Sequence, residues 1–362
     1  MNITRFGKPL AALAIAATAA LALSSCAANE GGAPASNLKG TFKGAGSSAQ
    51  DAAQQAWIAA FQTSNPGVTI NYEPSGSGAG RTAFISGAVA YAGSDAALST
   101  DELKKTFAAC AAGTTPFEVP NYISPIAVAF NVPGVTELNL DAATLAGIFS
   151  GAITKWDDPK IAALNSGAKL PSAAITAVHR SDNSGTTTNF TDYLAKTAPS
   201  VWTAAASGDF PTAFKGEAAK GTAGVADALT NGTNTIGYID ASKVGKLSTA
   251  KIKVGDKFVA YTPAAAAAVV AASPAVAGRD KTDMAIAINR TTTDSTQYPL
   301  VLVSYIIGCN TYADATVASL VKPYLQYILS PAGQKVSESA AGGAALSTTQ
   351  ANQALAIVNA IK

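Results

Sequence analysis

Three short turns, each rich in glycine and hydroxyl residues, carry the groups best suited to chemistry in this 362-residue chain. They occupy residues 44–48, 75–80 and 181–186, and each is expected to precede a helix. The first turn of a helix presents unpaired backbone N–H groups and about half a positive charge, so it attracts anions. Glycine lets the backbone approach a ligand closely, and serine or threonine adds a neutral donor. One such turn is more often a plain helix cap, but three of them favour an anion-binding site.

Arg180 stands at the expected end of a strand, directly before the third turn. Its planar guanidinium could donate paired hydrogen bonds to an oxyanion, and Asp182 could hold that group in place. A surface ion pair between Arg180 and Asp182 is an equally good interpretation of this spacing. His179 alternates with Arg180 along the strand, so it is expected to face the opposite side and to have a structural role.

Asp95 is an unexpected member of an anion site, because a carboxylate repels an anion. An ionised carboxylate only accepts hydrogen bonds, however, so it could accept one from a protonated oxyanion. Phosphate carries a proton near neutral pH and sulfate does not, so Asp95 could discriminate against sulfate. A turn or capping role for the Ser94-Asp95 pair is the simpler interpretation from the sequence alone.

The elements expected around these turns alternate between strands and helices. Trp57 and Phe61 are spaced i,i+4 and should share the buried face of one helix. Ser99 and Glu102 have the spacing of a capping box. This alternation predicts an α/β fold. Strands are expected at residues 68–72 and 175–180, and helices at 49–63, 186–196 and 263–273.

Composition limits the class of protein. Hydrophobic residues make up 48% of the chain, charged residues make up 13%, and the formal net charge is +2. This balance argues against disorder over most of the length, and it excludes a strongly basic duplex-DNA binder or membrane-surface protein. His179 is the single histidine, and Cys26, Cys110 and Cys309 lack the spacing of a zinc site. We therefore expect no metal site and no cofactor.

The N-terminus is typical of an exported protein, with a signal peptide expected at residues 1–25. Arg5 and Lys8 precede an apolar run at residues 10–23, which has the length of a signal-peptide core and is short for a membrane span. The run ends in Leu23-Ser24-Ser25-Cys26, which resembles the lipobox of bacterial lipoproteins. In that family the signal is cut before the cysteine, whose thiol carries lipid. An ordinary secretory signal with an incidental cysteine is the alternative.

The mature chain would begin with a tether at residues 26–37, rich in alanine, glycine and serine. Removal of residues 1–25 takes away two basic residues and no acidic residue, which leaves the mature chain formally neutral. Cys110 and Cys309 would then lie in an oxidising compartment, where a disulfide between them is possible, but the sequence does not establish it.

Four segments resemble, in their order, the high-affinity phosphate-binding proteins of bacterial ABC phosphate transporters. The segments are Gly44-Ala45-Gly46-Ser47-Ser48, Ser75-Gly76-Ser77-Gly78, Ala92-Gly93-Ser94-Asp95-Ala96-Ala97-Leu98-Ser99 and His179-Arg180-Ser181-Asp182-Asn183-Ser184-Gly185-Thr186-Thr187. Supporting stretches are Lys155-Trp156-Asp157-Asp158-Pro159, Ile161-Ala162-Ala163-Leu164-Asn165 and Ile236-Gly237-Tyr238. The likeness covers nearly all of the mature chain, and residues 180–186 are its most specific part.

The resemblance also implies residue roles. Asp95 would accept the phosphate proton, and Arg180 would supply the charged fork, steadied by Asp182. Ala49 replaces a bulkier residue common in the family, which matters little if only its N–H contacts the ligand. Asn183 stands where glycine is frequent, and asparagine tolerates a left-handed backbone better than most residues. The implied phosphate contacts are Ser48, Ala49, Ser77, Asp95, Arg180, Ser184, Gly185 and Thr186.

The family fold is the type II periplasmic-binding-protein fold, in which two crossings join two α/β lobes and the anion lies in the cleft between them. By this analogy the first lobe comprises residues 38–120 plus 300–362, and the second comprises residues 121–299. The crossings would lie near residues 120–122 and 298–300. Ligand contacts from both lobes would favour the closed form.

The implied function is that of an extracytoplasmic lipoprotein, anchored to the cell membrane through lipid on Cys26. It would bind inorganic phosphate and deliver it to the transmembrane subunits of an ABC transporter, with no catalysis and no nucleic-acid partner. A binding protein for sulfate, molybdate or another oxyanion is the nearest alternative. A phosphate-sensing or adhesive surface lipoprotein without transport partners is another.

Two interpretations of the chain as an enzyme also remain open. Residues 44–49 fit a Gly-x-Gly-x-x-Ala dinucleotide pattern, and Glu73 ends the next strand where an acidic ribose ligand could sit. The export signal argues against this reading, because nicotinamide cofactors are scarce outside the cell. A Ser-His-Asp hydrolase would have to use His179, and Ser77 lacks the flanking glycines of a nucleophile elbow.

Overall fold

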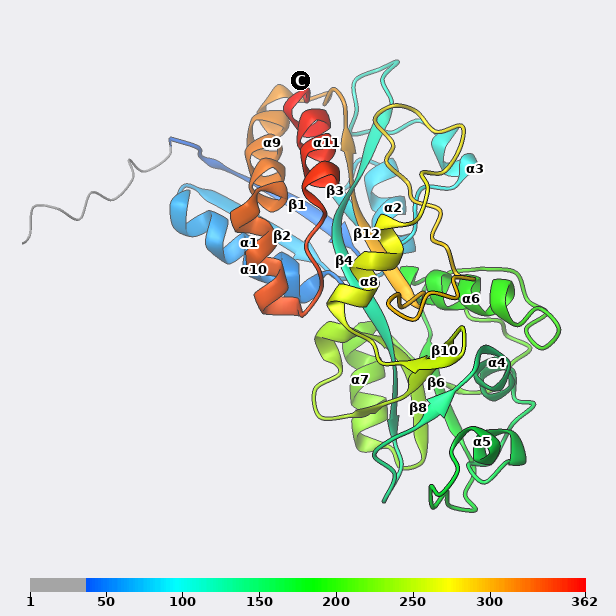
Figure 1. The fold of residues 1–362 in the computed structure, drawn as a ribbon. Helices are drawn as coiled ribbons and strands as arrows, with labels where there is room; N and C mark the ends of the chain where they lie inside the picture. The colour runs from blue at the N-terminus through cyan, green and yellow to red at the C-terminus, as the bar shows by residue number, and fades with distance from the viewer. Residues whose placement is uncertain (1–36) are drawn as a thin grey trace, which may run out of the picture.

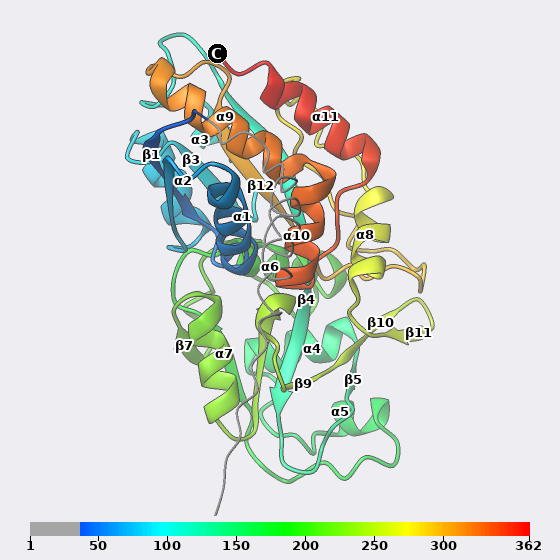
Figure 2. The same ribbon diagram turned by 90° about the vertical axis from the view of Figure 1, so that its left-hand side faces the viewer.

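The computed structural model describes residues 37–362. The expected signal peptide, most of the tether and the expected lipidation at Cys26 lie outside the described residues. The described chain forms two lobes, and the long strand β4 (Pro116–Asn131) runs through both of them (Figures 1 and 2). Within the described part, no helix is both long and apolar enough to span a membrane.

The first lobe is built from both ends of the described chain (Figure 1). Its strands are β1 (Gly40–Gly46), β2 (Val68–Glu73), β3 (Tyr91–Ser94) and β12 (Val301–Cys309). Its helices are α1 (Asp51–Ser64), α2 (Ser77–Ile85), α3 (Thr100–Leu103), α9 (Ala315–Leu329), α10 (Pro331–Ala341) and α11 (Thr348–Asn359). Strand β1 pairs in parallel with β2 and β3, and β12 pairs antiparallel with β3 and β4.

The chain between β4 and β12 builds the second lobe and the connection back to the first. Its strands are β5 (Asn139–Leu140), β6 (Thr176–Arg180), β7 (Glu217–Ala219), β8 (Thr235–Asp240), β9 (Ser248–Thr249), β10 (Lys251–Val254) and β11 (Lys257–Val259). Its helices are α4 (Ala142–Ser150), α5 (Pro159–Leu164), α6 (Gly185–Thr197), α7 (Gly221–Asn231), the short 3-10 helix η1 (Ala241–Lys243) and α8 (Pro263–Ala271). Strands β8, β6 and β7 are parallel, and β11, β10 and β5 form a separate small sheet.

Strand β4 joins the lobes because it changes its pairing partner. It pairs with β12 as far as Pro125, and with β8 from Ile126 onward. One sheet of order β2-β1-β3-β12-β4-β8-β6-β7 therefore passes through the whole molecule. The segment after α8 returns to the first lobe, where the Glu118 N–H donates to the Thr282 carbonyl oxygen at 2.9 Å and the Met284 N–H donates to the Glu118 carbonyl oxygen at 2.8 Å.

The expected local elements are confirmed where their signals were strongest. Helix α1 buries Trp57 and Phe61 on one face, as their spacing predicts. Ser99 and Glu102 form both bonds of the capping box at the start of α3. The alternation of residues 68–72 appears as β2, which is buried at every second residue.

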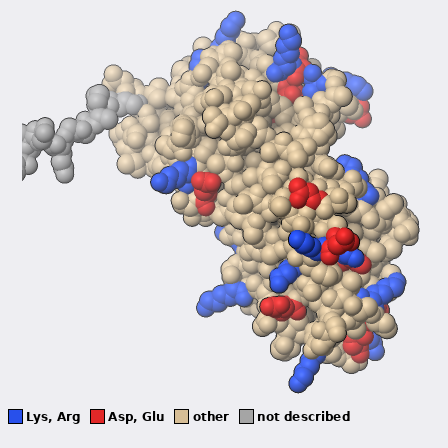
Figure 3. Space-filling view, viewed as in Figure 1, with Lys and Arg blue, Asp and Glu red and all other residues tan. Residues whose placement is uncertain are grey.

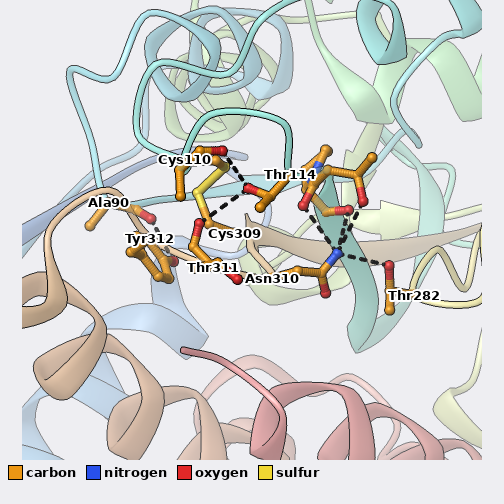
Figure 4. Close-up of a disulfide and its surroundings, with 11 residues drawn as sticks. Ala90, Cys110, Thr114, Thr282, Cys309, Asn310, Thr311 and Tyr312 are labelled. Carbon is orange, nitrogen blue, oxygen red and sulfur yellow. Dashed lines mark hydrogen bonds between the residues drawn. A yellow bond between two sulfur atoms is a disulfide. The ribbon is translucent and has the colours of Figure 1, made fainter.

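A disulfide joins Cys110, in the loop that follows α3, to Cys309 at the end of β12 (Figure 4). Hydrogen bonds brace the two segments on either side of it. Ala111 N–H donates to the Thr311 carbonyl oxygen at 2.9 Å, and Thr114 Oγ1 donates to the same carbonyl oxygen at 3.4 Å. The pairing that the sequence left open is therefore present, and it lies within the first lobe.

Candidate anion-binding site

Four helices begin where the two lobes meet. Helices α1, α2 and α6 follow the three expected turns, and α7 is a fourth that was not singled out from the sequence. Two contacts bring these ends together across the lobes. The Gly78 N–H in α2 donates to the Asn183 carbonyl oxygen at 3.3 Å, and the Thr222 N–H in α7 donates to Ser48 Oγ at 3.1 Å. The N–H-rich ends of helices from both lobes thus surround one region, which favours negative charge.

The first turn directs its hydroxyl groups in two directions. Ser47 Oγ accepts the backbone N–H groups of Ala49 at 3.1 Å and Gln50 at 3.2 Å. Ser48 Oγ lies 3.0 Å from Thr222 Oγ1 in the second lobe. Ser48 therefore lies against the facing lobe, whereas the Ala49 N–H donates within its own turn.

Asp95 follows β3 directly and is 3% exposed. Its backbone N–H donates to Ser77 Oγ at 3.1 Å, and the Ser304 hydroxyl donates to its Oδ1. Burial raises the pKa of Asp95, against the hydrogen bond from Ser304 and the charge of Arg180, which act to lower it. A Cβ atom at Gly185 would lie 2.5 Å from the Asp95 Cβ, so the start of α6 requires glycine to approach this closely.

Arg180 ends β6 and is 3% exposed. Its Nε donates to Asp182 Oδ1 at 2.8 Å, and its Nη2 donates to Asp182 Oδ2. The Gly221 N–H also donates to Asp182 Oδ1, at 3.0 Å. Burial opposes ionisation of Asp182, but the hydrogen bonds and charge of Arg180 outweigh it, so the pKa of Asp182 lies below its usual range. The expected bracing of Arg180 by Asp182 is confirmed, and the pair is not a surface ion pair.

The third turn supplies a helix cap, Ser184, and a buried hydroxyl group without a hydrogen-bond partner in the described part of the chain, Thr186. Ser184 Oγ accepts the Thr187 N–H at 3.2 Å and so caps α6. Thr186 is 2% exposed, and within residues 37–362 its Oγ1 has no hydrogen-bond partner. Burying a hydroxyl group without a partner costs about 1–3 kcal/mol. Buried hydroxyl groups without a partner are rare in native structures, and a bound ligand can supply the missing hydrogen bond.

His179 has a structural role, as expected. Its ring stacks on Phe210 with centroids 4.0 Å apart, and its Nδ1 lies 3.0 Å from the Arg180 carbonyl oxygen. Burial lowers the pKa of His179, against the hydrogen bond to Arg180 that raises it. Ser77, the serine of the hydrolase reading, instead contacts Asp95.

One detail of the third turn differs from the expectation. Among the described non-glycine residues, Asn234 alone has a positive φ. The left-handed conformation considered for Asn183 is therefore wrong. Its side chain instead fills the space above α2, where a Cβ atom at Gly78 would lie 2.2 Å from Asn183 Oδ1. Glycine is therefore required at position 78 in α2, which faces the third turn, and not at position 183 in the turn itself.

Two polar residues of the site were missed in the sequence. Ser304 lies within the apolar strand β12, far along the chain from every turn that indicated the site. Its only signal is a hydroxyl group in an otherwise apolar run. Thr222 follows Lys220 and Gly221 at the start of α7, and this short glycine-threonine turn has the same composition as the three that were recognised.

On the face drawn in Figure 3, basic and acidic side chains of the described residues are interspersed, and no patch of positive charge stands out. Within the described residues, no group of three or more His, Cys, Asp or Glu side chains is placed to hold a metal ion. The region between the lobes offers a small anion one guanidinium, from Arg180, and neutral donors at the helix ends, with the Asp95 carboxylate as an acceptor.

The chain is similar to known proteins over most of its length. Residues 31–332 match a family model described as a PBP superfamily domain. Phosphate-binding protein PstS2 of Mycobacterium bovis is 33% identical over 341 residues, which cover 90% of this chain and 92% of the relative. Phosphate-binding protein PstS 3 of Mycobacterium leprae is 35% identical over 343 residues, which cover 90% of this chain and 91% of the relative.

Solved structures show the same fold. A high affinity periplasmic phosphate-binding protein, PfluDING, solved with phosphate bound, has a TM-score of 0.71 at 24% identity. The match covers 88% of this chain and 93% of that one, and it supports the two-lobe α/β fold of type II expected from the sequence. On the family model and the two mycobacterial relatives, the chain belongs to the phosphate-binding proteins of the PBP superfamily.

Proposed function

We propose that this chain binds one inorganic phosphate ion between its two lobes, reversibly and without covalent chemistry. The observation that carries the proposal is a buried acceptor, Asp95, placed with a buried donor, Arg180, among the helix ends that meet there. The names of its relatives state phosphate binding, which supports the same ligand.

Phosphate suits this pair of groups better than sulfate does. Near neutral pH a phosphate ion carries a proton that it can donate to Asp95, while its other oxygens accept from Arg180 and the helix ends. Sulfate offers acceptors only, so a buried Asp95 carboxylate would face it without a hydrogen bond. Leaving a buried acceptor unpaired costs about 1–3 kcal/mol, and more when it is charged. The site is therefore selective for a protonated oxyanion.

The proposed contacts come from the three turns and from the end of β3. Asp182 is a positioning residue, because it holds the guanidinium of Arg180 through two hydrogen bonds. The Thr186 hydroxyl, which has no partner within the described chain, would donate to a phosphate oxygen. The residues proposed to contact phosphate are Ser48, Ala49, Ser77, Asp95, Arg180, Ser184, Gly185 and Thr186. The Ala49 N–H donates to Ser47 Oγ at 3.1 Å, so it would exchange this partner for a phosphate oxygen.

The proposal includes a division of the chain into a first lobe of residues 38–120 plus 300–362 and a second lobe of residues 121–299. The exchange of partners along β4, between Pro125 and Ile126, supports a junction near residue 121. The segment with Thr282 and Met284 is hydrogen-bonded to Glu118 of the first lobe, so the chain reaches the first lobe again before residue 299. Because the proposed contacts come from both lobes, phosphate would stabilise the closed arrangement over an open one.

We further propose that the protein works outside the cytoplasm and delivers phosphate to the transmembrane subunits of an ABC transporter. The export signal at residues 1–25 and the lipobox-like segment that ends at Cys26 support this location and a lipid anchor. Residues 26–37 would form the tether between the anchor and the first lobe. No catalytic role is proposed.

Isothermal titration calorimetry of the mature chain tests the phosphate proposal. Phosphate should bind and sulfate should bind far more weakly. Arg180→Ala should weaken phosphate binding by about 100-fold or more, because the buried anion loses its charged partner. Arg279→Ala is a matched control, since Arg279 also pairs with an aspartate, Asp283, at 3.0 Å, but outside the site. Normal affinity in Arg180→Ala, or sulfate binding as tight as phosphate binding, would refute the proposal.

A further inference from the structure

A chain of buried amide and hydroxyl groups lies behind Asp95 and has no part in the proposed phosphate contacts. Gln50 and Gln54, at the start of α1, are both 0% exposed. Gln50 Nε2 donates to Ser304 Oγ at 2.6 Å, and the Ser304 hydroxyl donates to Asp95 Oδ1. A glutamine buried at the base of a binding site is costly unless each end of its amide has a suitable partner.

A backbone carbonyl decides which end of the Gln50 amide faces Ser304. Gln50 Nε2 lies 3.1 Å from the Tyr305 carbonyl oxygen, which can only accept a hydrogen bond. The NH2 end of the amide must therefore occupy this position. Ser304 Oγ then accepts from Gln50, and its own proton is directed to Asp95.

The other end of the amide is satisfied with the same polarity. Gln50 Oε1 accepts from Gln54 Nε2 at 2.8 Å and from Asn121 Nδ2 at 3.2 Å. Gln54 Oε1 in turn accepts the hydroxyl groups of Tyr91 at 3.0 Å and Tyr324 at 2.9 Å. The bonds from the two tyrosines through Gln54 and Gln50 to Ser304 all donate toward Asp95, so reversing one would leave another group unpaired. Gln50 Nε2 also donates to Asn121 Oδ1 at 3.4 Å.

We propose that Gln50 and Ser304 are positioning residues that keep Asp95 a hydrogen-bond acceptor and thereby set the preference for a protonated oxyanion. This inference rests on the proposed phosphate function. The chain delivers a donor to Oδ1, which stabilises the ionised carboxylate. The other oxygen, Oδ2, accepts a long hydrogen bond from Ser77 Oγ at 3.4 Å. A carboxylate oxygen can accept more than one hydrogen bond, so Oδ2 can also accept the ligand proton.

The role matters because the surroundings of Asp95 oppose its ionisation. Burial raises the pKa of Asp95, while the Ser304 hydrogen bond is the largest influence that lowers it. Without that donor the carboxyl group would hold a proton at higher pH, and a protonated carboxyl group can donate to sulfate. The titratable and charged groups that face Asp95 are Arg180, Tyr72, Tyr122 and Asp240.

The test measures the ratio of sulfate to phosphate dissociation constants by calorimetry from pH 5.5 to 8.5. Ser304→Ala removes the donor directly, and Gln50→Met removes the group that orients it. Ser337→Ala is the control, because Ser337 is also a buried serine but bonds only within α10, to the Gln334 carbonyl oxygen at 2.8 Å. Burial raises the pKa of Asp240 to about 6, and the charge of Asp95 contributes to that rise, so the pH profiles of the variants are compared with the profile of the control over the whole range.

In both variants the preference for phosphate over sulfate should fall about tenfold or more relative to the control, as expected for a lost hydrogen bond to a charged group. The pH below which sulfate begins to bind should move upward. A simple packing defect would weaken both anions alike and leave the ratio and its pH profile unchanged, which would overturn the inference. Thermal unfolding identifies a variant that fails to fold. In that case the ratio of dissociation constants is measured on the other of the two variants and tests the inference alone.

The proposed function and this inference fail in different ways. Absence of phosphate binding by the unaltered chain would refute the function and the inference with it. Selective phosphate binding by the unaltered chain, with the same ratio in Ser304→Ala and Gln50→Met as in Ser337→Ala, would refute the inference alone.

Discussion

At the scale of single residues, the buried threonines at the start of α6 have opposite hydrogen-bonding states. Thr187 Oγ1 lies 2.7 Å from the Tyr238 hydroxyl, so the fold itself satisfies it. Thr186 Oγ1 is equally buried and has no partner within residues 37–362. A hydroxyl group of the first kind stabilises the folded chain, whereas one of the second kind destabilises it until a ligand supplies the missing bond.

Thr186→Val separates these two roles, because valine keeps the shape and removes the hydroxyl group. The variant should bind phosphate about tenfold more weakly, as expected for one lost hydrogen bond to a charged ligand. The free energy of unfolding of the ligand-free chain should stay the same or rise slightly. Calorimetry and urea unfolding measure the two quantities.

Thr187→Val is the matched control, because the same change one residue later removes a buried hydrogen bond of the Tyr238 hydroxyl, which then keeps only the bond that it accepts from the Arg180 N–H at 3.2 Å. It should lower the free energy of unfolding by about 1–3 kcal/mol. If Thr186→Val loses stability as Thr187→Val does and keeps its phosphate affinity, the Thr186 hydroxyl has a structural role and no ligand role.

At the scale of elements, the site depends on how closely α2 packs on β1. Gly80 in α2 lies against the end of β1, where an added Cβ atom would come within 2.3 Å of the Gly46 Cα and 2.7 Å of the Ala45 carbonyl oxygen. Both are backbone atoms of a paired strand, which cannot move as a flexible side chain could. Because α2 begins at Ser77, its distance from β1 also sets the position of that hydroxyl group.

Gly80→Ala should therefore push α2 away from β1. We expect a loss of about 1–3 kcal/mol in the free energy of unfolding, as for an overpacked core, together with weaker phosphate binding. Urea unfolding and calorimetry on the same preparation provide both measurements.

Gly224→Ala in α7 is the control for this substitution. An added Cβ atom there meets Ala219 at an ordinary contact distance of 3.7 Å. Alanine should stabilise that helix by about 0.5–1 kcal/mol, because glycine loses more backbone freedom on folding. Equal stability of Gly80→Ala and Gly224→Ala would show that α2 can shift without cost.

At the scale of the whole molecule, hydrogen bonds join the lobes at the site itself. Asn189 Nδ2 in α6 donates to the Asp95 carbonyl oxygen at 2.7 Å, and Thr222 in α7 bonds Ser48. The disulfide between Cys110 and Cys309 lies within the first lobe, at the end of β12 away from the lobe junction, where Cys309 pairs with Pro116. Stability and ligand binding should therefore be separable.

Replacing both Cys110 and Cys309 by alanine tests that separation. The two residues are 199 positions apart, so the bond restricts a long stretch of the unfolded chain. Its loss should lower the free energy of unfolding by about 2–5 kcal/mol. Phosphate binding should change by less than about 0.5 kcal/mol, as for distant independent sites. A large loss of affinity in a fully folded double variant would instead connect the disulfide to the site.

Sequence patterns predicted the elements well where one local interaction dominates. The spacing of Trp57 and Phe61 and the capping pair of Ser99 and Glu102 depend on residues within one or two turns of each other. Ser304 could not be predicted to face Asp95, because the two are 209 residues apart and meet only through the antiparallel pairing of β12 with β3. No local pattern encodes that meeting.

The sequence by itself determined which groups are available to an anion: three glycine and hydroxyl turns before helices, an arginine two residues before an aspartate, and a carboxylate. These follow from helix capping and side-chain chemistry, which act over a few residues. Only the tertiary structure decided which of them are buried together, that Thr186 lacks a partner, and that Gln50 orients Ser304 toward Asp95. The reason is physical: burial and hydrogen-bond direction depend on every neighbour in space, and the sheet that runs through both lobes brings those neighbours from distant parts of the chain.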